Sequence, residues 1–269
     1  MRNLFRAFRA LLKTETNVML QYRGEIVLWS IWGLVNPLVL YAIFKAGAQS
    51  NANGMMAGMT VPQIAAYYFA VMVVGHVTAA WDTHDMGYYI RSGRMSGFLL
   101  RPILPIWRSL AGNLAYKICT LMFVGPMWIL VVFLIHPQFD CAPWQLGLGI
   151  IAIIMAFALN YCLTYTIALI AFWTTKLDAV GEVYFGLMMF LGGRYVPLQA
   201  LPKWLRYIAD ALPFQYMAYF PVDLMTGHLS DRRLILHSFA GQLCWFLAAI
   251  LAFRVFWSAA VKRYTAVSG

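Results

Sequence analysis

The stretch LGLGIIAIIMAFALNYCLTYTIALIAFW, residues 146–173, contains no charged residue. A helix needs about 20 predominantly apolar residues to cross the hydrocarbon core of a bilayer. This stretch exceeds that length and is long enough to cross with some tilt. It therefore predicts a transmembrane helix, and with it a membrane protein.

Five further apolar runs lie on either side of this stretch. The chain is 62% hydrophobic and only 11% charged, whereas soluble domains carry roughly 25% charged residues. We therefore expect an all-α polytopic membrane protein with six transmembrane helices, forming a single transmembrane domain over residues 1–269. The further runs cover residues 26–44, 61–81, 106–135, 179–193 and 239–257.

Residues 1–25 precede the first run and predict an amphipathic helix. At about 100° per residue, an apolar stripe lies nearly opposite a basic stripe, which is typical of a helix in the membrane interface. A mitochondrial-type targeting peptide is the alternative, but Glu15 and the absence of serines disfavour it. The apolar stripe consists of Leu4, Phe8, Leu11 and Leu12, and the basic stripe of Arg2, Arg6, Arg9 and Lys13.

The basic residues predict an orientation. The chain has 20 Lys plus Arg against 10 Asp plus Glu, a net charge of +10, which in a membrane protein favours contact with anionic lipid over nucleic-acid binding. With six spans, thirteen basic residues near span ends fall on the side of the termini and six on the other. We therefore expect a multi-pass plasma-membrane protein with both termini cytoplasmic. The six are Lys45, Arg194, Lys203, Arg206, Arg232 and Arg233.

The segment between the second and third runs, residues 82–105, reads DTHDMGYYIRSGRMSGFLLRPILP. It is too polar to insert and too short for a domain, and glycines punctuate it. Pro102 and Pro105 end any helix before the third run. Two interpretations stay open: a polar connector, or a docking element that receives force from a soluble partner.

Candidate chemical groups are sparse. His84 stands between Asp82 and Asp85, but three such side chains cannot all converge from one helix face, so we expect a solvated turn and no metal site. Lys117 and Glu182 lie near the ends of predicted spans, where snorkelling explains them. The motifs GxxxxGK[ST], HExxH and GxSxG are absent, so the energy for any active transport must come from another chain.

The fifth run is too short to cross about 30 Å alone. We expect residues 194–221 to complete it as a re-entrant outer hairpin, because irregular backbone at membrane depth must be covered by protein or line a cavity. Pro202 suits the first position of a helix that Pro213 ends, with Trp204 on its apolar stripe. Together with Pro197, these residues form a predicted outer gate. An ordinary extracellular loop with an aromatic belt is the alternative.

Two stretches carry a resemblance to a known family: SGRMSGFLLRPILP, residues 92–105, and VPLQALPKWLRYIADALPFQYMAYFPVDLMTG, residues 196–227. The chain resembles ABC transporter permeases of the type-2 exporter class, in particular the branch with an SGxxSxxLLRP-like cytoplasmic loop. The resemblance covers essentially the whole chain and implies a bacterial cytoplasmic membrane. It also implies a homodimer or heterodimer of permeases docked to cytoplasmic ABC ATPase subunits that carry Mg-ATP, with no cofactor in this chain. The implied ATPase-coupling positions are Arg91, Ser92, Gly93, Arg94, Ser96, Gly97, Leu99, Leu100, Arg101 and Pro102.

The expected function is therefore export of an amphipathic or lipophilic cargo, such as a drug, toxin, lipid or glycan. The resemblance does not name the cargo, although cationic aromatic toxins have been linked to this branch. An ATP-independent channel or secondary carrier is the alternative, and an intramembrane enzyme or assembly protein is a third.

We expect the translocation path at the dimer interface, lined by the first, second and fifth runs. Met and aromatic side chains on the fifth run offer an adaptable, polarizable surface for amphipathic cargo. Ordinary packing between helices explains the same side chains equally well. The predicted path residues are Asn36, Tyr184, Phe185, Met188 and Met189.

Overall fold

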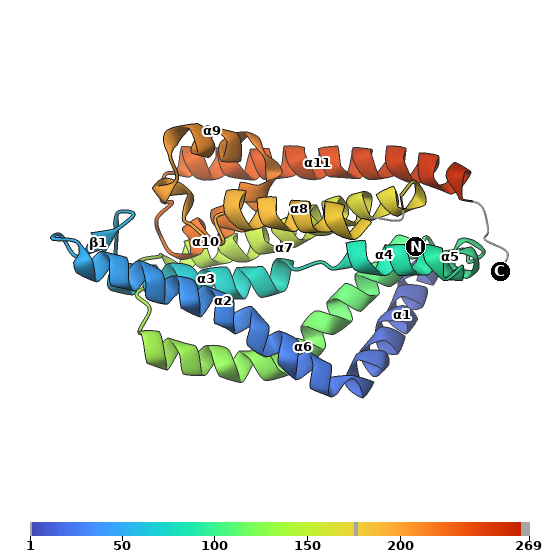
Figure 1. Cartoon of the computed structure of the whole chain (residues 1–269), viewed down its shortest axis with the longest axis horizontal. Helices are drawn as coiled ribbons and strands as arrows, with labels where there is room; N and C mark the ends of the chain where they lie inside the picture. Colours follow the sequence, from blue (N-terminus) through green and yellow to red (C-terminus); the bar gives the residue numbers. More distant parts are fainter. Residues whose placement is uncertain (1, 175–176, 265–269) are drawn as a thin grey trace.

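The computed structural model describes residues 2–174 and 177–264, mostly as helices that run along one long axis (Figure 1). The start of α1 and the end of α11 lie at the end of the bundle that carries α4 and α5, while β1 and α9 lie at the opposite end. The first half contains α1 (Arg2–Gln21), α2 (Arg23–Ser50), β1 (Met55–Met56), β2 (Met59–Thr60), α3 (Val61–Thr78), α4 (Asp82–Arg91), α5 (Arg94–Leu99) and α6 (Pro105–Ile135). The second half contains α7 (Pro143–Ala168), η1 (Leu169–Phe172), α8 (Leu177–Leu191), η2 (Leu198–Ala200), α9 (Lys203–Ala211), η3 (Pro213–Met217), α10 (Tyr219–Met225) and α11 (Arg232–Arg263).

Within residues 2–174 and 177–264, five helices are long and apolar enough to cross a membrane, so the chain is a multi-pass membrane protein. The fifth predicted run forms α8, whose 15 residues extend about 22 Å at about 1.5 Å per residue. Six full spans are therefore not confirmed among the described residues. The five cover Gly24–Ser50, Val61–Thr78, Pro105–Ile135, Pro143–Phe172 and Arg232–Arg263.

The predicted N-terminal helix is confirmed as α1, which packs along the start of α6. The rings of Phe8 and Trp107 meet edge to face with centroids 6.1 Å apart. Glu15 Oε1 accepts a hydrogen bond from Arg108 Nε at 3.0 Å. The basic residues of the predicted stripe that the structure describes, Arg6, Arg9 and Lys13, are exposed, as an amphipathic helix requires.

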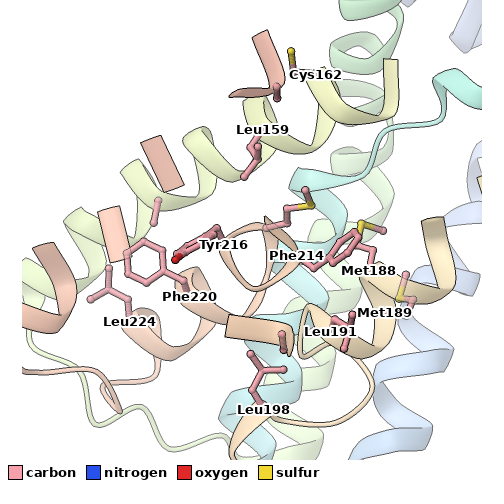
Figure 2. Close-up of a cluster of buried hydrophobic side chains, with 14 of the residues drawn as sticks. Leu159, Cys162, Met188, Met189, Leu191, Leu198, Phe214, Tyr216, Phe220 and Leu224 are labelled. Carbon is pink, nitrogen blue, oxygen red and sulfur yellow. The ribbon is translucent and has the colours of Figure 1, made fainter. Parts of the chain in front are cut away.

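A hydrophobic core connects α7, α8, α11 and the segment that follows α8. In Figure 2, Met188 and Met189 of α8 lie close to Phe214, while Leu159 and Cys162 come from α7. Because lipid tails are as apolar as these side chains, close van der Waals packing between the helices stabilises this core. This core positions the end of α8 and the turn that leaves it.

The segment after α8 folds back against the bundle. The helix predicted between Pro202 and Pro213 is confirmed as α9, and its Trp204 is 65% exposed. The chain then turns inward, so that η3 and α10 are almost wholly buried. This segment is therefore part of the core rather than a loose loop.

Candidate functional site: a buried arginine between two cavities

A tight turn ends α8 and reverses the chain. The backbone amides of Arg194 and Tyr195 both donate to the carbonyl of Met189, at 3.1 and 3.0 Å. Gly193 has φ +77°, and a Cβ there would lie 3.0 Å from Tyr219. The preceding Gly192 has no room for a side chain either, because a Cβ would collide with the carbonyl of Met188. Both glycines are therefore required by the turn.

Two tyrosines of α3 hold this turn in place. The hydroxyl of Tyr67 donates to the carbonyl of Gly193 at 2.6 Å, and that of Tyr68 donates to the carbonyl of Tyr195 at 3.0 Å. Both tyrosines are fully buried, and their rings meet edge to face. The end of α8 is thus fixed to α3 through hydrogen bonds in the protein interior.

The reversal turns Arg194 inward. Its side chain is only 6% exposed and its Nη2 donates to Thr78 Oγ1 at 2.7 Å, at the end of α3. The prediction that Arg194 flanks a span on the outer surface is therefore wrong. Statistics of basic residues at span ends do not anticipate a turn that directs a guanidinium back into the bundle.

Behind this contact lies a buried polar network. Asn160 of α7 donates from Nδ2 to the carbonyl of Thr78 at 2.7 Å, and its Oδ1 accepts from the hydroxyl of Tyr184 at 2.7 Å. Thr78 in turn donates to the carbonyl of Val74 at 2.8 Å. The network joins α3, α7 and α8, and satisfies polar groups whose burial would otherwise cost free energy.

Arg194 lines a cavity of about 170 Å³, which we name the aromatic cavity. The cavity lies between α2, α3, α6, α8 and the turn after α8. Four of the five predicted path residues line it, namely Asn36, Phe185, Met188 and Met189. Tyr184 is not among its lining residues, because its ring packs on Phe214 and its hydroxyl belongs to the polar network. The aromatic lining residues are Trp29, His76, Trp81, Tyr116, Trp128, Phe185 and Tyr195.

A second cavity of about 360 Å³, which we name the polar cavity, lies between α1, α4, α6 and α7. Trp81 and Tyr116 line both cavities and so separate them. Asp82 is buried in the polar cavity, where its carboxylate accepts from Ser109. Burial, and secondarily the charge of Asp85, raises the pKa of Asp82 to about 8. The remaining titratable or charged lining residues are Glu15, Asp85, Tyr89, Arg108, Tyr116 and Tyr165.

Lys117 lies beside the wall between the cavities. Its Nζ donates to the carbonyl of Ala79 at 2.7 Å and stands 4.4 Å from the centroid of the Phe157 ring. The prediction that Lys117 snorkels to the membrane surface is therefore wrong. Because α3 ends at Thr78, the carbonyl of Ala79 has no helical donor and accepts the ammonium instead. Glu182 of α8 is exposed.

Residues 82–105, predicted as a connector or docking element, form two short helices. Gly93, with φ +70°, precedes α5 and separates it from α4. Met86 and Met95 are buried against α7, α8 and α11, and Ser96 and Tyr264 share a hydrogen bond of 2.7 Å. The segment is therefore fixed to the bundle along its inner side, which a free connector would not be.

The outer side of this segment is exposed. Leu100 is 88% exposed at the end of α5. Arg94 lies over the ring of Tyr88 and Arg101 over that of Phe98, at 5.1 and 5.6 Å. We name the exposed residues the α5 surface. It consists of Arg91, Ser92, Arg94, Gly97, Leu100, Arg101 and Pro102, whereas Gly93, Ser96 and Leu99 are half-buried.

The other predicted sites are dispersed. Pro197 and Pro213 are buried, while Pro202 and Trp204 are exposed, so the four predicted gate residues do not converge on one point. Lys176, counted as a basic flank, and the side chain of His84 lie outside the described parts. Within those parts, no group of three or more metal-ligating side chains occurs.

A comparison with known protein families identifies the family to which this chain belongs. The model of the ABC-2 family transporter protein matches residues 31–268. The chain belongs to the ABC-2 transporter family. Members supply the membrane component of an ABC transporter, so this chain is a permease subunit and not the subunit that hydrolyses ATP. A comparison with curated proteins finds no match.

Proposed function

We propose that this ABC-2 permease subunit forms the membrane part of an ATP-driven exporter. The observation that carries the proposal is the α5 surface, where the exposed Leu100 stands among arginines on a segment anchored to three helices of the bundle. Leu100 and the neighbouring arginines together offer a partner an apolar contact and hydrogen-bond donors, and arginine is enriched at protein interfaces. A cytoplasmic ATPase that binds here would transmit its closure to α4, α7 and α11.

Two cavities in series support a path along which this motion acts. The polar cavity lies on the side of α4, and only Trp81 and Tyr116 separate it from the aromatic cavity. Since α4 starts directly after Trp81, displacement of α4 moves one side of that partition. We propose that cargo enters from the cytoplasm or inner leaflet, passes this partition, and leaves by the segment after α8.

The assembly that we propose is a pair of permeases with a pair of ATPases, which bind Mg-ATP. The second permease is a copy of this chain or a related one. Apolar residues of α8 on the side away from the core, such as Val183, Leu187 and Phe190, are exposed and are available to a second permease or to lipid. Both termini would face the cytoplasm, since the start of α1 and the end of α11 lie at the same end as the α5 surface.

Purification of the chain from its native membrane tests the proposal. We expect an ATP-hydrolysing subunit to accompany the wild type, and Leu100→Asp to reduce its retention about tenfold or more. The double variant Arg94→Glu/Arg101→Glu should do the same through charge reversal at the contact. Neither change removes buried contacts, so the melting temperature of the purified permease should stay unchanged.

The matched control reverses two exposed arginines at the opposite end, Arg232 and Arg233 at the start of α11. Their replacement by glutamate should leave retention of the ATPase as in the wild type. If the Leu100 variant and the Arg94/Arg101 double variant both retain the ATPase as well as the wild type does, the α5 surface is not the docking site.

A proton-coupled secondary carrier is the second candidate, and one observation favours it. Asp82 is buried with a pKa of about 8 and lines a cavity beside the partition. Transport into inverted vesicles separates the two functions: an exporter requires ATP, whereas a carrier works with a pH gradient alone.

A further inference from the structure

The guanidinium of Arg194 carries a charge that the described chain does not neutralise. Its Nη2 donates to the neutral hydroxyl of Thr78, and its Nε has no hydrogen-bond partner. Within residues 2–174 and 177–264, the ion pair found is Glu15–Arg108, in the other cavity. A buried cation without a counter-charge is strongly unfavourable unless something supplies the missing charge.

A second unpaired donor lines the same cavity. The indole Nε1 of Trp128 is buried and has no acceptor, and Trp128 is a lining residue of the aromatic cavity. No Asp or Glu occurs among the described residues that line it. Arg194 Nε, from the turn after α8, and Trp128 Nε1, from α6, thus both lack an acceptor. The chemistry missing from the cavity is that of an anion.

The other residues that line the aromatic cavity indicate the chemistry of the rest of the ligand. Trp29, Tyr116 and Phe185 contribute aromatic surface, and Met188 and Met189 contribute adaptable apolar surface. The cavity measures about 170 Å³, whereas a space of about 10–15 Å³ by the same measure holds one water. It therefore has room for a head group with an adjoining ring or short chain.

We propose that the aromatic cavity binds the anionic group of an amphiphilic cargo, with Arg194 as its counter-charge and Trp128 as a second donor. The proposal rests on the proposed export function and names its substrate class. A guanidinium presents donors in a planar fork that fits carboxylate and phosphate oxygens. An anionic amphiphile is one kind of the amphipathic cargo expected from the sequence, and its charge is opposite to that of the buried Arg194.

A purely structural role predicts something different. If Arg194 only ties the turn after α8 to Thr78, its loss lowers stability but does not depend on the charge of any ligand. The charge of the ligand is therefore the variable that separates the two roles.

The test uses the complete permease–ATPase complex in nanodiscs of phosphatidylcholine. The probes are undecanoic acid that carries a dansyl group and the methyl ester of the same compound, with binding followed by dansyl fluorescence. The wild type should bind the acid at least tenfold more tightly than the ester, because a hydrogen bond to a charged group is stronger than one to a neutral group. Arg194→Gln should abolish this preference while affinity for the ester stays within about twofold.

A second variant covers the case in which Arg194→Gln does not fold. Trp128→Phe keeps an aromatic ring in the lining and removes only the N–H. It should weaken binding of the acid several-fold and leave binding of the ester unchanged. Trp144→Phe, at an exposed position of α7 outside the cavity, is the matched control and should change neither probe.

Nanodiscs that contain phosphatidylglycerol distinguish the source of the anion. If they displace the acid, the anionic group belongs to a lipid; if they do not, it belongs to a free amphiphile. Equal binding of acid and ester by the wild type, or an unchanged preference in both Arg194→Gln and Trp128→Phe, would overturn the proposal. Retention of the ATPase in the same samples shows whether the export function itself still holds.

Discussion

The two cavities differ in how they treat charge. In the polar cavity, Glu15 pairs with Arg108 at 3.0 Å, and the buried carboxyl of Asp82 lies against Ser109 and Asn113. In the aromatic cavity, Arg194 faces aromatic and sulfur-containing side chains and no acid among the described residues. The polar cavity thus contains an ion pair supplied by the chain, whereas the buried charge of Arg194 has no acid beside it among the described residues.

This difference indicates that the polar cavity is a contact between helices and the aromatic cavity a binding site. The ion pair in the polar cavity joins α1 to α6, and Ser109 of α6 donates to Asp82 of α4, so its polar contacts hold these three helices together. A cavity that keeps unsatisfied donors loses stability in its empty state and regains it when a ligand arrives. Trp81 and Tyr116 line both cavities and therefore lie where the two kinds of site meet.

The largest expected loss of folding stability is at Asn160 of the buried polar network. Asn160→Leu removes the amide that joins α3, α7 and α8, and strands the hydroxyl of Tyr184 and the carbonyl of Thr78. A buried unsatisfied group costs about 1–3 kcal/mol, so we expect about 2–5 kcal/mol from thermal or denaturant unfolding in detergent. Asn113→Leu in the polar cavity is the matched comparison.

Asn113 Nδ2 donates to the carbonyl of Ser109 within the same helix at 3.2 Å, its contacts with Asp82 are long, at 3.4 and 3.5 Å, and its Oδ1 is already unpaired. Its replacement should therefore cost about 1 kcal/mol or less. Equal losses in the Asn160 and Asn113 variants would contradict the distinction between the rigid network and the polar cavity.

A smaller effect is the pH dependence that Asp82 introduces. Its pKa is raised by burial to about 8, so the folded state keeps a proton that the unfolded state releases. Its stabilising contribution is complete below the unfolded pKa of about 4 and declines by about 1.4 kcal/mol per pH unit up to pH 8. Unfolding at pH 5 and pH 7 should show about 3 kcal/mol more loss in the wild type than in Asp82→Asn. Parallel curves for the two proteins would show that Asp82 is ionised in the folded state.

The smallest effect is expected at the pair of Glu15 and Arg108. Both side chains retain exposure, 14% and 35%, so solvent screens their attraction and Glu15→Gln should cost about 0.2–1 kcal/mol. The loss should shrink further in high salt. A loss of several kcal/mol in the unfolding experiment would mean that α1 is more deeply integrated into the fold than its exposed face indicates.

Local patterns predicted much of the fold. The long apolar runs became α2, α3, α6, α7 and α11 because their composition leaves the bilayer as their only solvent. The amphipathic pattern before the first run became α1, and the prolines at 202 and 213 marked the limits of α9. Each of these signals lies within the segment that it shapes.

The missed features depend on contacts between distant segments. The sequence of residues 82–105 indicates a polar turn, but Met86 and Met95 anchor two helices there only because α7 and α11 provide a surface for them. Arg194 was assigned to a surface by its charge, and the signal for its burial was the pair Gly192–Gly193 directly before it. Two adjacent glycines after a short apolar run permit the reversal that sends the next side chain inward.

The bond between Arg194 and Thr78 also bears on how the chain enters the membrane. It joins residues 116 positions apart, so α3 has left the ribosome long before α8 is made. Arg194 lies in the turn directly after α8, and burial of its charge costs free energy that the 15 residues of α8 must help to offset. With α3 already in the bilayer, Thr78, Tyr67 and Tyr68 offer partners to the turn as it arrives. We therefore expect insertion of α8 and the turn after it to depend on α3 being in the membrane first.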